Sequence, residues 1–232
     1  MAYTASRTTN GFELIGNLLN VTDNGRNYEL TPNTAFTKGD MVVLTNGKVA
    51  KAAANAANVL GVMAESITAA DNPTAGITHG KVYDNPFNVY RCSFADQTDS
   101  TATGGTTTTL IDTGLATSDN DYWNGALLYV YAGTNAGCIR TVTDYVGSTD
   151  TLHFQAMPAA CDTTTKYIIL GGAAAASDSI NVGSVGVDLK DENTVDANAT
   201  IVSEAGPLAA LGINPANLTM DVVVRKHRFN GI

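Results

Sequence analysis

Positive charge is scarce in this sequence. Of its 232 residues only 13 are Lys or Arg, against 22 Asp or Glu, and the formal net charge is −9. Proteins that bind nucleic acids neutralise phosphates with Lys and Arg, so this balance predicts no nucleic-acid partner. The one basic cluster is Arg-Lys-His-Arg at residues 225–228. A run of this length is typical of a strand end that lies in solvent.

Cysteine and long apolar runs are also rare. The three cysteines, Cys92, Cys138 and Cys161, lie far apart and form no C-x-x-C pair. This spacing argues against a disulfide framework and against a structural zinc site, so we expect buried free thiols. No apolar stretch is long enough to cross a bilayer, and the first residues do not resemble a signal peptide. These absences predict synthesis in the cytosol and no membrane partner.

Motifs for catalysis are missing as well. The three histidines are His79, His153 and His227. None has a second ligand at metal spacing, and neither a G-x-S-x-G turn nor a phosphate-binding G-K-[ST] loop occurs. We therefore expect a protein that is not an enzyme and has no catalytic residues and no cofactor.

Acidic turns are the remaining candidates for chemistry. They lie at residues 119–125 and 188–196, but the twelfth residue counted from Asp119 is Val130, where an EF-hand needs Glu. We expect no metal site, and two alternatives stay open. One is calcium held loosely by these turns, and the other is an enzyme whose paired carboxylates converge in a cleft.

Short apolar runs separated by turn residues dominate what is present. Charged residues make up 15% of the chain and hydrophobic residues 44%, which is typical of strands joined by tight turns. The Asn46-Gly47 pair between two apolar runs predicts a hairpin. Residues 151–156 alternate apolar and polar side chains, as a half-buried strand does. We predict an all-β fold with strands at residues 41–44, 48–51, 59–64, 80–83, 87–94, 127–131, 138–145, 151–156, 167–170 and 221–224, and a short helix at 207–212.

Two polar stretches, residues 95–108 and 171–177, have little to bury and are predicted to be linkers. They divide the chain into an N-terminal arm (1–30), a base domain built from both chain ends (31–94 and 178–232), and an inserted β domain with its linkers (95–177). We expect the base to be a small β-barrel or sandwich-like domain. In the arm, the apolar residues Phe12, Leu14, Leu18 and Leu19 have little of their own domain to pack against in sequence.

The segment FTKGDMVVLTNGKVAKAAANAANVLGVMAES at residues 36–66 resembles the small β domain of capsid decoration proteins, or cement proteins, of tailed bacteriophages. The ending MDVVVRKHRF at residues 220–229 is similar to the closing strand of that group. The resemblance covers about half the chain. It implies a homotrimer on the outer surface of an icosahedral virion, with the major capsid protein as partner. The base domain would then contact the shell, and the inserted domain would point outward. The resemblance assigns no individual contact residue. We expect the N-terminal arm to contact the capsid through Phe12, Leu14, Leu18 and Leu19, because these side chains have little of their own domain to pack against in sequence.

A second structural role stays open. A phage tail, baseplate or host-adhesion protein would also be rich in β-structure and poor in catalytic motifs. An aromatic cluster that stacks on sugars would favour it, and Tyr122, Trp123 and Tyr129 are the candidates. A lone Trp beside strand starts is more often a packing residue, so we expect Trp123 in a core.

Overall fold

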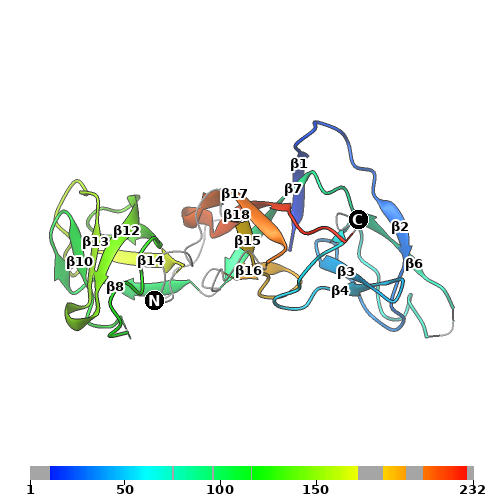
Figure 1. Cartoon of the computed structure of the whole chain (residues 1–232), viewed down its shortest axis with the longest axis horizontal. Coiled ribbons are helices and arrows are strands. Elements are labelled where there is room, and N and C mark those ends of the chain that lie inside the picture. Colours follow the sequence, from blue (N-terminus) through cyan, green and yellow to red (C-terminus); the bar gives the residue numbers. More distant parts are fainter. Residues whose placement is uncertain are drawn as a thin grey trace.

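The computed structural model describes residues 11–74, 76–95, 97–115, 117–171, 185–196 and 206–228. Their regular structure is almost entirely β, in three sheets that follow one another along the length of the molecule (Figure 1). Two short 3-10 turns, Gly147–Thr149 and Pro215–Asn217, are the other elements of the described residues. The predicted all-β class is therefore confirmed. Every strand predicted from the sequence is found, with small shifts at the ends.

The first sheet lies at one end of the molecule and has five strands in the order β2-β6-β5-β3-β4. They are β2 (Arg26–Glu29), β3 (Met41–Thr45), β4 (Lys48–Lys51), β5 (Gly61–Met63) and β6 (His79–Tyr83). The predicted hairpin joins β3 to β4, with Thr45 opposite Lys48. Asn46 has φ 51° and Gly47 has φ 80°. Asn and Gly adopt these values readily, which is why this pair marks a two-residue turn.

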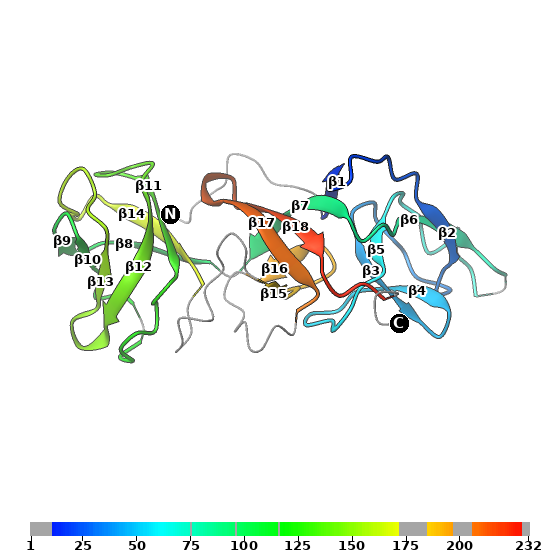
Figure 2. The same ribbon diagram turned by 45° about the horizontal axis from the view of Figure 1, so that its top comes forward.

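The second sheet is central and combines strands from distant parts of the sequence (Figure 2). Its order is β1-β7-β18-β17-β15, and β16 pairs with β7 in parallel. The strands are β1 (Glu13–Asn17), β7 (Asn88–Ala95), β15 (Val185–Val187), β16 (Thr194–Asp196), β17 (Leu208–Asn214) and β18 (Thr219–Val224). One face of the sheet buries Tyr90, Cys92, Met220 and Val222 in the central core.

The third sheet takes all seven strands from residues 98–170, in the order β8-β14-β11-β12-β13-β10-β9. They are β8 (Thr98–Thr101), β9 (Gly104–Gly105), β10 (Thr109–Ile111), β11 (Leu127–Ala132), β12 (Ile139–Val146), β13 (Thr151–Phe154) and β14 (Lys166–Leu170). The strands at the two ends of this order, β8 and β9, are separated only by Ala102 and Thr103. The sheet therefore curls back on itself around its own core, and we call residues 98–170 the barrel unit.

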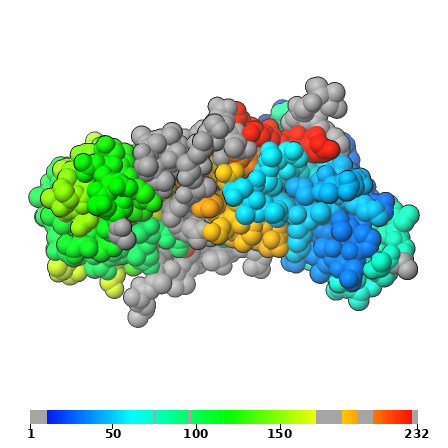
Figure 3. Space-filling view, turned by 60° about the horizontal axis from the view of Figure 1, so that its bottom comes forward, coloured from blue at the N-terminus to red at the C-terminus, as the bar shows by residue number. Residues whose placement is uncertain are grey.

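Strand β14 joins the barrel unit to the central sheet. Its residues are buried on both faces. Tyr167 and Ile169 belong to the barrel core, whereas Ile168 and Leu170 belong to the central core. The turn at Pro215–Asn217 also contacts β11. The space-filling view shows the barrel unit and the five-stranded sheet at opposite ends of an elongated molecule (Figure 3).

The five-stranded sheet is joined to the central sheet by hydrogen bonds and an ion pair. Met41 N donates to Glu192 O at 2.7 Å, and Lys51 Nζ lies 3.0 Å from Asp40 and 3.1 Å from Glu192. Val59 and His227 form a parallel bridge. The basic cluster at 225–228 is thus not a uniform solvent-exposed surface, since His227 is buried.

Three expectations need correction. The predicted helix at 207–212 is part of strand β17, because pairing with β18 along its whole length outweighs the local Pro and Gly signals. The predicted linker at 95–108 contains β8 and β9, which close the barrel unit through backbone pairing. Residues 11–30 of the predicted arm contain two paired strands: β1 belongs to the central sheet and β2 to the five-stranded sheet. Its first ten residues, and residues 172–177 of the second linker, lie outside the described residues.

Candidate interaction surface

The four capsid-contact residues predicted from the sequence lie in different environments. Phe12 is 2% exposed and belongs to the central core, and its N–H donates to Gly39 O at 2.8 Å. Leu14 is partly buried against the same core. Leu18 and Leu19 follow the end of β1 and are 55% and 58% exposed. Phe12 is therefore a core residue, and the expectation that it has little of its own domain to pack against is wrong.

Leu18 and Leu19 are part of a larger exposed group. We call it the apolar corner, and it consists of Leu18, Leu19, Val21 and Phe87, each of which is at least 45% exposed. Leu18 N donates to Phe87 O at 2.9 Å, which places the two residues side by side where β1 and β7 end. The segment between β1 and β2 runs along the outer margin of the molecule (Figures 1 and 2). Sequence reasoning missed Val21 and Phe87, and Phe87 in particular is brought beside Leu18 only by the pairing of β1 with β7.

A hydrogen-bond network holds the segment that carries the corner. Asn17 accepts from Leu19 N at 2.9 Å through its side chain and donates to Asn88 Oδ1 at 2.9 Å. Buried Asn88 donates to Asp23 Oδ2 at 2.6 Å, and Asp23 Oδ1 accepts from Gly25 N at 2.7 Å. The backbone that presents Leu18 and Val21 is therefore fixed before any partner arrives. Binding through such a segment loses less conformational entropy than binding through a free arm.

A hollow of about 280 Å³ opens beside the corner. Its lining residues are Leu14, Gly16, Asn17, Asn20, Val21, Thr22, Asp23 and Asn88. It combines two apolar side chains with amide and carboxylate groups that already hydrogen-bond one another. A partner side chain that enters it would contact Leu14 and Val21 without breaking the network around Asn88.

A second hollow, of about 230 Å³, lies on the central sheet and is polar. Arg91 Nε and Nη2 donate to the two carboxylate oxygens of Asp221 at 2.7 and 2.9 Å, and this hydrogen bonding raises the pKa of Arg91. Among the described residues that line it, Asp221 is the one acidic residue. Paired-carboxylate hydrolysis needs a second carboxylate, so this hollow does not supply the geometry of the enzyme alternative.

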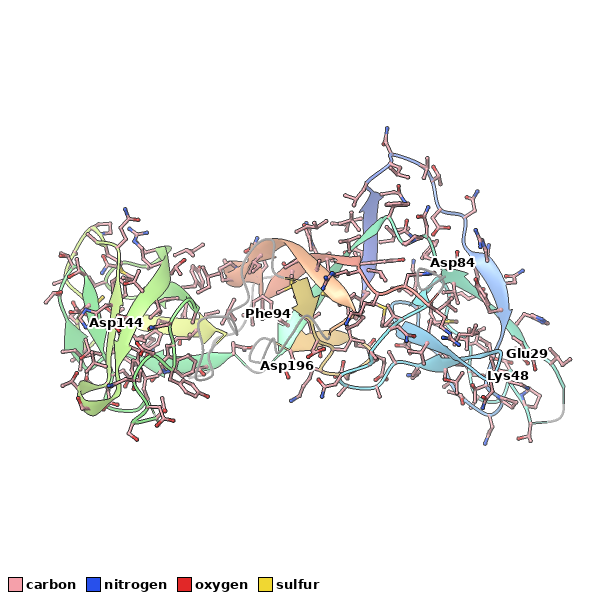
Figure 4. The ribbon with its side chains drawn as sticks, in the orientation of Figure 1. Glu29, Lys48, Asp84, Phe94, Asp144 and Asp196 are labelled. Carbon is pink, nitrogen blue, oxygen red and sulfur yellow. The ribbon has the colours of Figure 1, made fainter. Side chains whose placement is uncertain are left out.

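Two other carboxylates, those of Asp40 and Glu192, do meet, but both are paired with Lys51 Nζ, at 3.0 and 3.1 Å. Figure 4 labels Glu29, Asp84, Asp144 and Asp196, which lie in three separate parts of the molecule. Glu29 is paired with Lys48 at 2.6 Å, and Asp84 accepts a hydrogen bond from Tyr28. Within the described residues, no group of three His, Cys, Asp or Glu side chains is placed to hold a metal ion.

Side-chain oxygens of the Asp-rich turns accept hydrogen bonds from other groups of the chain. Asp191 Oδ1 accepts from Asn193 N at 2.8 Å and from Thr194 N at 2.7 Å. In the other turn, Asn120 Oδ1 accepts from Gly147 N at 3.0 Å. Side chains with such hydrogen bonds typically stabilise turns.

The aromatic residues considered for sugar stacking do not share a surface. Trp123 is buried in the barrel core, with the ring of Tyr122 edge-on at 4.8 Å. Tyr129 packs against the central core instead. The three rings are thus divided between two cores, and their first role is packing.

Comparison of this chain with protein-family models, with curated proteins and with solved structures finds no match. None of the described elements is a helix of the length and apolarity needed to cross a bilayer.

Proposed function

We propose that this protein decorates the outer surface of an icosahedral phage head and stabilises it, with the major capsid protein as its partner. The apolar corner carries the proposal. Soluble monomeric proteins rarely expose large apolar patches, and apolar side chains grouped on the surface mark interaction sites. The resemblance of residues 36–66 and 220–229 to capsid decoration proteins gives the class of partner.

The binding free energy that the apolar corner can supply is sufficient for a shell that offers many equivalent sites. Each apolar side chain of the corner supplies about 1.5–3 kcal/mol when it is fully buried at an interface, before ordering costs are subtracted. A single corner then gives modest affinity. In a homotrimer three corners bind together, and avidity raises the occupancy without further contacts. The net charge of −9 disfavours binding to packaged nucleic acid.

Capsids of the same phage that lack this protein provide the test. The purified chain should bind their outer surface, visible as added density by electron cryomicroscopy and as co-sedimentation. Leu18→Asp with Leu19→Asp should reduce occupancy at least tenfold, because a buried charge opposes the interface. Ile77→Asp is the matched control, since Ile77 is an exposed apolar residue outside the corner. It should bind like the wild type.

If the double variant and the wild type occupy capsids equally, the apolar corner is not part of the interface. Failure of the wild-type chain to bind any capsid of its own phage would overturn the decoration role. It would favour a tail, baseplate or host-adhesion protein instead, for which the same chain should be found in purified tails.

A further inference from the structure

Two loops of the barrel unit meet at one end of it. The Asn135 side chain donates to Ala159 O at 2.9 Å and accepts from Ala159 N at 3.0 Å. Its Nδ2 also lies 3.8 Å from Cys161 Sγ. Asn135 therefore fixes the turn between β11 and β12 against the segment that contains Cys161.

Cys138 lies on the same turn and faces the same core. Its N–H donates to Asn135 O at 3.0 Å, and its carbonyl accepts from Val130 N at 2.9 Å. Residues paired in this way on adjacent strands direct their side chains to one face. Val130 is buried in the barrel core, Cys138 packs against that core, and Cys161 is part of it. Both thiols are thus at the end of the barrel unit where Asn135 joins the two loops.

We propose that Cys138 and Cys161 form a disulfide when the protein meets an oxidising small-molecule disulfide such as oxidised glutathione. The half-buried Cys138 thiolate attacks one sulfur of the oxidant, forms a mixed disulfide and releases one reduced thiol. Cys161 then loses its proton and attacks the Cys138 sulfur, which releases the second reduced thiol. Two protein thiols are oxidised and one small-molecule disulfide is reduced.

The order of attack follows from burial. Burial raises the pKa of Cys161, so little of it is thiolate, and it reacts second, by intramolecular attack on the mixed disulfide held beside it. Cys92 is fully buried in the central core, and its thiol donates to Met220 O at 3.5 Å. Cys92 therefore remains reduced and serves as an internal standard.

The test uses the purified full chain incubated with oxidised glutathione. After quenching and unfolding, the thiol count should fall from three to one, and digestion should yield a disulfide-linked peptide pair that contains Cys138 and Cys161. The oxidised protein should also melt about 5 °C higher than the reduced protein, since a closed loop restricts the unfolded chain. Reduction should reverse both changes.

Two variants separate the roles of the thiols. Cys161→Ala should stop at a glutathione adduct on Cys138, whereas Cys138→Ala should take up almost none. Cys92→Ala is the control and should still form the linked pair. Three thiols after incubation, or an adduct on Cys138 in the wild type without the linked pair, would overturn the proposal.

Discussion

Tyr167 and Ile168 are consecutive residues of one strand, and they are packed in two different cores: Tyr167 in the barrel core and Ile168 in the central core. Both are fully buried. Strand β14 thus contributes one face to each core. The barrel unit is therefore packed on the central sheet and is not attached to it through linkers alone. A substitution that destabilises one core should therefore also lower the stability of the other.

Met220→Ala tests this coupling. Met220 lies in the central core and is 1% exposed, so the substitution should lower the free energy of unfolding by about 2–5 kcal/mol. Trp123, the single Trp of the chain, lies in the barrel core. Its fluorescence midpoint in urea should shift together with the circular dichroism midpoint. A Trp123 midpoint that stays at the wild-type value would mean that the barrel unit unfolds independently.

Phe12 and Leu18 should respond in opposite ways in stability and in binding. Phe12→Ala leaves a cavity in the central core and should cost about 3–5 kcal/mol of stability. Leu18→Ala removes an exposed side chain and should change stability by less than about 0.5 kcal/mol, while it weakens capsid binding. Thermal melts and co-sedimentation of the two variants check this. A large loss of melting temperature in Leu18→Ala would show that the apolar corner is part of the fold.

Asp112 should be a stabilising residue of the barrel unit. It is buried and accepts hydrogen bonds from Tyr167 OH at 2.6 Å, from Gly114 N at 2.8 Å and from the Ser100 hydroxyl. Asp112→Ala leaves these donors without an acceptor and should cost about 3 kcal/mol or more. Asp119→Ala, at an exposed position of a nearby loop, is the control and should be almost neutral. Urea unfolding of both variants measures the difference, and similar costs would contradict the assignment.

Asp188 should make stability depend on pH. Burial raises the pKa of Asp188, Asp196 raises it further, and Lys226 opposes them. The native state therefore binds this proton more tightly than the unfolded state does. Its ionisation destabilises the fold as pH rises through the raised pKa, and the penalty disappears below the ordinary Asp range.

Asp188→Asn should accordingly raise the melting temperature at about pH 7 and have little effect at about pH 3. Asp144→Asn, on an exposed part of the barrel unit, is the control and should be neutral at both values. A gain for Asp188→Asn that is the same at both pH values would point to a cause other than ionisation.

Local patterns predicted the strands well. The Asn46-Gly47 turn and the alternation of Leu152 and Phe154 each depend on neighbours in sequence, and both are found. Residues 207–212 were expected to be a helix, since the extended conformation of β17 is favoured by its partner β18, which is not visible in the local sequence. The threonines of β8 were expected to be a linker, because their contribution is backbone pairing with β14 and leaves no apolar pattern.

The candidate surface was only partly predictable. Exposed Leu18 and Leu19 were identified because no nearby apolar pattern accounted for them. Phe12 looked equivalent, but it packs on residues from the far end of the chain. Phe87 lies 69 positions after Leu18 in the printed sequence, and only the pairing of β1 with β7 shows that the two belong together.

The pairing of β7 with β18 has a consequence for how the protein is made. Cys92 and Met220 lie opposite each other in this ladder although 128 residues separate them. On the ribosome, β7 emerges long before its partner, while the barrel unit has all its own strands by residue 170. During that interval β7, which carries Tyr90 and Phe94, lacks its neighbouring strand β18. The nascent chain therefore exposes an incomplete sheet with an unpaired edge and apolar side chains. Slow translation past residue 170 should therefore lower the soluble yield of this protein.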